Sequence, residues 1–175
     1  MTSYIALLRA VNVGGTGKLP MSELKALCED AGFAHVRTYI ASGNLLFDST
    51  DSEKKVKAAL EAKLKAHAGK PVDVIVRTAT EFADTLKRNP FAAQPGNRVM
   101  VLFTDDKPPA DPLKDARGRK DEQVKAGKRV LYIFYPDGQG KSRLQLPAME
   151  SGTARNMNTV ARLTEMAKAK AKAKA

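Results

Sequence analysis

The N-terminal half of the chain alternates short apolar segments with longer segments in which apolar residues recur every three or four positions. The short segments predict strands, which cover residues 4–11, 36–40, 45–47 and 72–77. The periodic segments predict helices, which cover residues 21–31, 50–69 and 78–88. Up to Arg77 the predicted element order is therefore β-α-β-β-α-β.

Polar and glycine residues at the helix ends support these boundaries. Thr50 with Glu53, and Thr78 with Glu81, each have the spacing of a capping box, in which the two side chains bond backbone N–H groups at the start of a helix. Gly32 suits the C-terminal cap of the first helix, because glycine adopts a left-handed conformation without a steric penalty.

This element order is that of a ferredoxin-like fold. The expected sheet is four-stranded and antiparallel with the spatial order 4-1-3-2, and both helices cover one face. Right-handed crossovers make strands one and two parallel. The ends of strands one and two then lie at the same edge of the sheet.

The second half has a less regular pattern. We expect strands at residues 98–104 and 130–135, with a proline- and aspartate-rich loop at residues 105–112. Residues 113–119 are expected to form a short helix, whereas residues 141–151 fit no single element. A last helix begins at Asn156 or Asn158.

Together these elements predict an α+β protein. A ferredoxin-like subdomain over residues 1–90 is expected to pack with a smaller α/β subdomain over residues 91–167. Residues 168–175 alternate lysine and alanine, and this tail either extends the last helix or frays.

Two polar, glycine-bearing breaks follow strands one and two. The first is Asn12-Val13-Gly14-Gly15-Thr16-Gly17-Lys18, and the second is Ala41-Ser42-Gly43-Asn44. Because both are expected at one edge of the sheet, their backbone N–H groups, amides, hydroxyls and lysine suit an anion. Tight structural turns account for the same glycines without any ligand.

A further polar segment runs from Thr153 to Thr159, where we expect the last helix to open. The helix dipole favours acidic side chains at a helix N-terminus, so it does not explain Arg155. An arginine with two asparagines there can hold an anion, and capping with an ion pair is the structural alternative. The candidate ligand-binding residues are therefore Arg9, Asn12, Gly14, Gly15, Lys18, Ser42, Gly43, Asn44, Arg155 and Asn156.

The sequence lacks the dinucleotide-binding motif G-x-G-x-x-G after a strand, the H-E-x-x-H metal motif and the nucleophile-elbow motif G-x-S-x-G. The P-loop pattern fails, because Asn12 stands where it needs glycine and Leu19 where it needs serine or threonine. His35 and His67 are the only histidines, and both are expected at the surface. No catalytic residue, cofactor or metal site can be assigned, and whether the protein is an enzyme stays open.

Composition narrows the class of protein further. Of its 175 residues 43% are hydrophobic, yet no apolar run approaches the ~20 residues that span a bilayer. Cys28 is the only cysteine, which excludes an internal disulfide, and its place on a helix stripe predicts a core position. We therefore expect a cytoplasmic protein without membrane association.

The net charge is +11, to which the tail contributes four lysines. Such a surplus favours weak, non-specific binding of nucleic acid through counterion release. A solvated basic surface is the alternative explanation.

Several blocks spread over nearly the whole chain match a known pattern. The longest runs from Tyr4 to Gly15, and shorter ones lie at residues 37–40, 42–44, 89–91 and 153–156. Together they resemble the bacterial family called domain of unknown function sixteen-ninety-seven. That family usually has glycine and isoleucine in place of Ala10 and Val11, and tryptophan in place of Met157. The resemblance implies two α+β subdomains, the first ferredoxin-like, and no established activity.

Three functions are compatible with these features. The leading hypothesis is binding of a phosphate-bearing small molecule or nucleotide at the glycine-rich edge. The second is a nucleic-acid-binding accessory protein, and the third is an enzyme of unknown reaction that uses Arg9, Lys18 and Arg155 as electrostatic stabilisers. Binding that falls steeply with salt favours the second hypothesis, and a saturable, salt-tolerant ligand favours the first.

Overall fold

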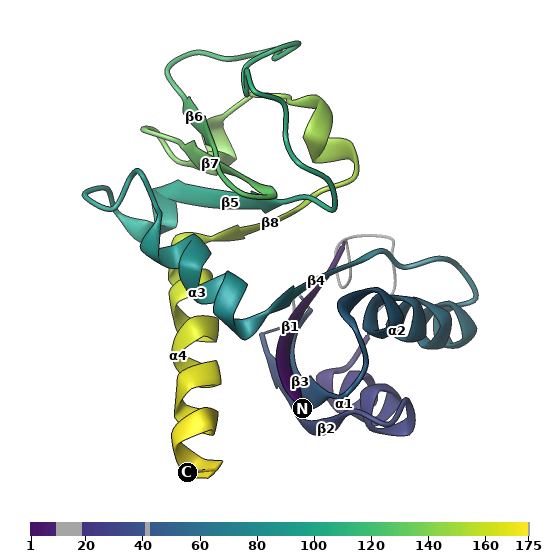
Figure 1. Ribbon diagram of the computed structural model, residues 1–175. Coiled ribbons are helices and arrows are strands. Elements are labelled where there is room, and N and C mark those ends of the chain that lie inside the picture. Colours follow the sequence, from purple (N-terminus) through teal and green to yellow (C-terminus); the bar gives the residue numbers. More distant parts are fainter. Residues whose placement is uncertain (10–18, 41–42, 175) are drawn as a thin grey trace. The chain divides into compact units, whose positions relative to one another are not determined.

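The computed structural model describes residues 1–9, 19–40 and 43–174, with side chains up to residue 169. Within these ranges the chain is an α+β fold with four α-helices and two four-stranded antiparallel sheets (Figure 1). It divides into two compact units, Met1–Phe82 with Met166–Ala175, and Ala83–Glu165. The divisions fall within α3 (Ala79–Lys87) and α4 (Met157–Lys174). The domain boundaries expected at residues 90 and 167 stay predictions.

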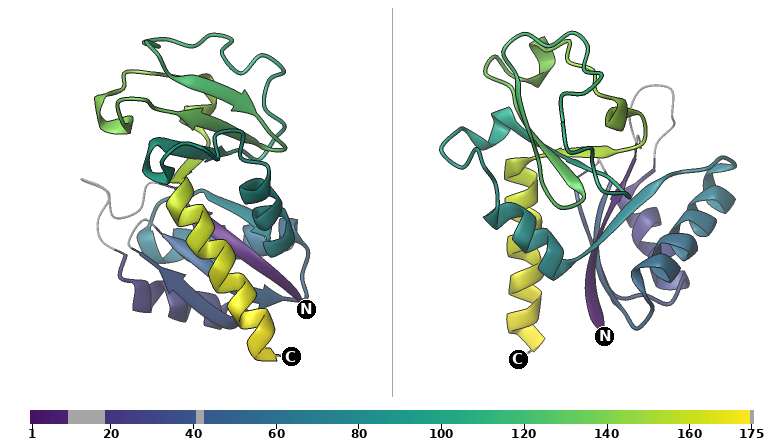
Figure 2. Two further views of the ribbon diagram at one scale, coloured as in Figure 1. Left: turned by 90° about the vertical axis from the view of Figure 1, so that its left-hand side faces the viewer. Right: turned by 45° about the horizontal axis from the view of Figure 1, so that its top comes forward.

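The first unit has the predicted ferredoxin-like topology. Its sheet has the order β2-β3-β1-β4, and every neighbouring pair is antiparallel. The helices α1 (Met21–Asp30) and α2 (Glu53–Ala68) lie side by side on one face of this sheet (Figure 2). The predicted strand order and the placing of both helices are confirmed. The strands are β1 (Thr2–Leu8), β2 (Ala34–Tyr39), β3 (Asn44–Ser49) and β4 (Val74–Thr78).

Alternate residues of the central strand β1 form the core with the two helices. Tyr4, Ala6 and Leu8 belong to the same buried cluster as the helix stripes and β3. Cys28 in α1 is fully buried in this cluster, as predicted. Burial raises the pKa of its thiol to about 12, so the thiol stays protonated at neutral pH.

The start of α2 differs from the prediction. The N-cap is Ser52, whose side chain accepts a hydrogen bond from the Lys55 N–H at 3.3 Å, and not Thr50. Asp51 is held outside the helix, because its N–H donates to Ser49 and its carbonyl accepts from the Tyr4 hydroxyl. The helix therefore begins after Asp51.

The start of α3 follows the sequence pattern. Thr78 Oγ1 accepts a hydrogen bond from the Glu81 N–H at 3.1 Å, which confirms the second capping box.

The second unit contains the other sheet. It consists of β5 (Val99–Phe103), β6 (Gln123–Ala126), β7 (Val130–Phe134) and β8 (Thr153–Asn156) in the order β6-β7-β5-β8. The strand β6 was not expected, because its sequence has no clear alternation of apolar and polar residues. In the structure only one of its four residues is buried.

The segment expected to open the last helix forms strand β8 instead. Thr153–Asn156 pairs antiparallel with β5, and α4 begins only at Met157. Asn156 is the residue that precedes this helix, and its Oδ1 accepts a hydrogen bond from the Thr159 N–H at 2.9 Å.

No helix forms over residues 113–119, contrary to expectation. Asp115 and Gly118 have positive φ values of 61° and 68°, which interrupt a right-handed helix. Residues 141–151, which fitted no single element, contain the 3-10 helix Pro147–Glu150 and the end of another, Gln139–Lys141.

Candidate functional site

The end of β1 is bonded to both neighbouring segments of the first sheet. The Leu8 N–H donates to the Gly43 carbonyl, and the Arg9 N–H donates to the Asp73 carbonyl, each at 2.9 Å. The described end of β1 is therefore bonded directly to Gly43, which belongs to the second polar break.

The turn between β2 and β3 has a constrained backbone. Ile40 and Gly43 have positive φ values of 51° and 87°, and the Gly43 N–H donates to the Ile40 carbonyl at 3.3 Å. Asn44 is fully buried, and its Nδ2 donates to the Tyr39 carbonyl at 2.8 Å. The Asn44 amide thus shapes the turn from inside.

Of the other candidate residues near this edge, only Arg9 belongs to the described part of the chain. Arg9, the last described residue before the first break, is half-buried. Asn12, Gly14, Gly15, Lys18 and Ser42 lie outside the described residues.

Arg155 and Asn156 belong to the second unit. Arg155 is 8% exposed on β8, and its Nη1 donates to the Ala154 carbonyl at 2.9 Å. Burial lowers the pKa of its guanidinium to about 10, so Arg155 stays charged at neutral pH. Asn156 acts as the cap of α4.

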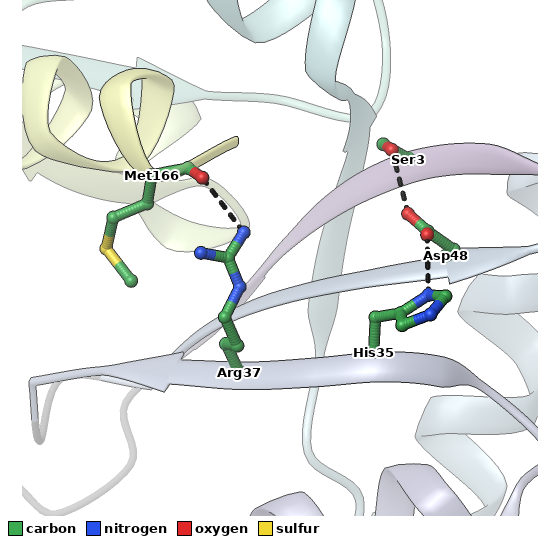
Figure 3. Close-up of polar contacts among 5 residues, drawn as sticks. All are labelled: Ser3, His35, Arg37, Asp48 and Met166. Carbon is green, nitrogen blue, oxygen red and sulfur yellow. Dashed lines mark hydrogen bonds and ion pairs between the residues drawn. The ribbon is translucent and has the colours of Figure 1, made fainter. Parts of the chain in front are cut away.

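A polar cluster in the first unit was missed by the sequence analysis. Asp48 on β3 is 1% exposed, and its two oxygens accept hydrogen bonds from Ser3 Oγ at 2.8 Å and His35 Nδ1 at 2.9 Å (Figure 3). Since a carboxylate only accepts, Nδ1 of His35 carries a proton. His35 is exposed as predicted, but its ring is oriented by a buried acid.

The backbone at His35 is unusual for a non-glycine residue. Its φ is 54°, and the register of β2 on β3 shifts between Ala34 and Arg37. A bulge of this kind re-aims side chains, and here it presents the imidazole to Asp48. No local sequence signal identifies this pair, because it depends on the bulged register.

Arg37 lies on the same strand, close to α4 (Figure 3). Its Nη2 donates to the Met166 carbonyl at 2.9 Å, and its buried Nε has no hydrogen-bond partner in the part of the chain that the structure describes. Desolvation lowers the pKa of the Arg37 guanidinium, and the nearby Asp48 charge opposes that shift.

Two further features are absent from the described ranges. Residues 1–9, 19–40 and 43–174 contain no group of three His, Cys, Asp or Glu side chains that could hold a metal ion. No helix within them is both long and apolar enough to cross a membrane.

Comparison with known proteins identifies a family and a fold. The family model described as Protein of unknown function (DUF1697) matches residues 1–132. The structure of conserved bacterial protein SP0830 from Streptococcus pneumoniae is similar, with a TM-score of 0.77 and 24% sequence identity, over 95% of this chain and 98% of that one. This identity shows a shared fold alone. No curated protein matches the chain.

Proposed function

Because the chain belongs to the DUF1697 family, whose description assigns no activity, we propose a function from its own residues. The protein binds a phosphate-bearing small molecule or nucleotide where the ends of β1 and β2 share an edge of the first sheet.

The hydrogen bond between the Leu8 N–H and the Gly43 carbonyl is the observation that carries this proposal. This bond joins the end of β1 to Gly43, a residue of the second break, which supports a common site for the two breaks. Residues from both breaks can therefore reach one ligand. The structural frame of the turn, built by Gly43 and the buried Asn44, supports that edge from inside.

The sequence of the two breaks favours phosphate among anions. Three glycines at positions 14, 15 and 17 let backbone N–H groups converge on an anion, and Lys18 adds a positive charge. Charge-assisted hydrogen bonds from such donors suit the several oxygens of a phosphate group. The net charge of +11 raises the local concentration of any such anion.

Calorimetric titration tests this function. The panel consists of inorganic phosphate, pyrophosphate and adenosine mono-, di- and triphosphate at about 0.15 M salt. We expect saturable binding of at least one ligand, weakened about tenfold by Lys18→Ala. Lys25→Ala, which removes an exposed lysine of α1, is the matched control and should leave the affinity unchanged. If the parent protein binds nothing in the panel, the glycines have only a structural role and the proposal fails.

The charge also favours a second candidate, a nucleic-acid-binding accessory protein. Its binding would fall steeply with salt, by about 0.9 logarithmic units per phosphate contact for each tenfold rise in salt concentration. A salt-tolerant small ligand and salt-steep binding to duplex DNA therefore separate the two functions.

A further inference from the structure

The second unit contains an open cleft with a volume of about 410 Å³. Three loop segments line it, at residues 118–122, 135–138 and 141–143. This volume lies in the range of small-molecule sites in proteins. The cleft includes none of the residues assigned to the proposed phosphate site.

The walls of the cleft are held at a fixed distance. The Arg117 N–H and the Gln145 N–H each donate to the other residue's carbonyl, at 2.9 and 2.7 Å. Gly118 has a φ of 68°, and a Cβ built on it would lie 2.1 Å from the Arg143 carbonyl oxygen. Only glycine permits this approach, so the cleft is formed before any ligand arrives.

An ionised carboxylate is part of the lining of the cleft. Glu122 is 4% exposed, and its oxygens accept hydrogen bonds from the Lys120 N–H at 2.7 Å and the Ser142 hydroxyl at 3.0 Å. The bond from the Lys120 N–H is the main reason that the pKa of Glu122 is lowered. Both hydrogen-bond partners are neutral groups, the positive charge of Arg119 lowers the same pKa further, and the Glu122 side chain belongs to the lining of the cleft.

The rim carries the opposite charge. Lys120, Lys141 and Arg143 are exposed lining residues, and they outnumber the exposed acids Asp121 and Asp137. The lining of this cleft therefore combines one buried carboxylate with three exposed cations and two exposed acids. A simple anion is opposed by Glu122, and a simple amine is opposed by the rim.

We propose that this cleft binds a small molecule that carries both a protonated amine and a carboxylate, with its amine towards Glu122 and its carboxylate towards Lys141 and Arg143. Each charge of such a ligand is paired with a group of opposite sign, and hydrogen bonds to charged groups are the stronger class.

Nuclear magnetic resonance titration of the ¹⁵N-labelled protein tests the charge requirement. The probes are glycine, β-alanine, 4-aminobutyrate and 6-aminohexanoate, which separate the same two charges by increasing lengths. Butyrate and butylamine are the matched probes with one charge each. We expect saturable shifts of the amides at residues 118–122 and 136–143 with one of the amino acids, and binding about tenfold weaker for butyrate and butylamine. The proposal is overturned if no amino acid gives saturable shifts there, or if butyrate or butylamine binds as well.

Variants test the assigned partners. Lys141→Gln should weaken amino-acid binding about tenfold without weakening butylamine, whereas Lys128→Gln, an exposed lysine outside the cleft, should change neither. Glu122→Gln should reduce binding of the amino acid to that of butyrate. If Glu122→Gln does not fold, Lys141→Gln against Lys128→Gln decides, and equal effects of these two overturn the proposal.

Discussion

Nδ1 of His35 lies 2.9 Å from Oδ2 of Asp48, and this hydrogen bond secures a bulge in the edge strand of the first sheet. Ser3 bonds the other oxygen of the same carboxylate. Asp48 on β3 thus ties together the strands on both of its sides, β1 through Ser3 and β2 through His35. The bond also offsets the positive φ of His35, which costs about 1–2 kcal/mol for a residue other than glycine.

Two substitutions of His35 distinguish the stability that the hydrogen bond contributes from the cost of the backbone strain. His35→Ala should lower the free energy of unfolding by about 1–2 kcal/mol, because it removes the bond and keeps a Cβ at positive φ. His35→Gly should be about 1 kcal/mol more stable than the alanine variant, since glycine adopts this conformation freely. Urea unfolding of both variants measures the difference. A glycine variant less stable than the alanine variant would contradict the account of strain.

Removing the acceptor should cost more than removing either donor. Asp48→Ala leaves the donors on Ser3 and His35 without this acceptor, and we expect a loss of about 2–4 kcal/mol. Ser3→Ala serves as the control and should cost about 1 kcal/mol. Similar losses in the two variants, again by urea unfolding, would show that Asp48 does not link the three strands energetically.

Three glycines near the cleft should respond to alanine in a graded order. Gly118→Ala should be the most destabilising, by more than about 2 kcal/mol, because the added methyl group meets the Arg143 carbonyl. Gly138→Ala has open space but a φ of 87°, so about 1 kcal/mol is expected. Gly140→Ala has neither restriction and should be neutral within about 0.5 kcal/mol. Thermal unfolding of the three variants checks the order, and a tolerated Gly118→Ala would contradict the close approach.

Two buried tyrosines should make the protein sensitive to alkaline pH. Burial raises the pKa values of Tyr132 and Tyr135 from 10.0 to about 12. A phenol with a raised pKa in the folded state contributes stability that is complete below pH 10 and is lost as the pH rises towards 12. We expect the free energy of unfolding to fall across that window, and Tyr132→Phe and Tyr135→Phe each to flatten the fall. A stability that is unchanged between pH 10 and 12 would contradict this expectation.

Deleting residues 168–175 should affect electrostatics more than stability. The deletion removes four lysines, so the salt slope of duplex DNA binding should fall by up to about 0.9 per lost phosphate contact. Lys168 and Ala169 are exposed, so the melting temperature should hardly change. A salt titration of both proteins, with melting curves alongside, measures the two effects. Equal slopes would show that the tail takes no part in binding, and a large drop in melting temperature would show that it supports the fold.

Local signals in the sequence were sufficient to predict most helices and strands of the first unit. The capping residues Thr78 and Glu81 lie within one helical turn of each other, and the alternation along β4 needs no knowledge of its partners. Thr50 and Ser52 are both hydroxyl residues near the start of α2, and the cap falls on Ser52 where the distant Tyr4 hydroxyl bonds the Asp51 carbonyl. Such a contact cannot be recognised from local spacing.

The second unit depends more on long-range pairing. Asn156 caps α4 as its polarity predicts, yet pairing with β5, more than fifty residues earlier, places Arg155 and Asn156 themselves in a strand. Glu122 likewise shows no motif, because its partner Ser142 joins it only after the loops have folded. The edge cluster was predicted from the two polar, glycine-bearing breaks and the expected sheet topology, and its role stays a prediction.

The division of the chain determines the order in which the first unit can be completed during synthesis. Arg37 and the Met166 carbonyl that it binds are separated by 129 positions. At about 5–20 residues per second, the ribosome adds Met166 to the chain on the order of ten seconds after it adds Arg37. All of Ala83–Glu165 is synthesised in that interval. The first sheet is therefore synthesised before α4. Until α4 supplies the Met166 carbonyl, the Arg37 guanidinium is hydrogen-bonded to water.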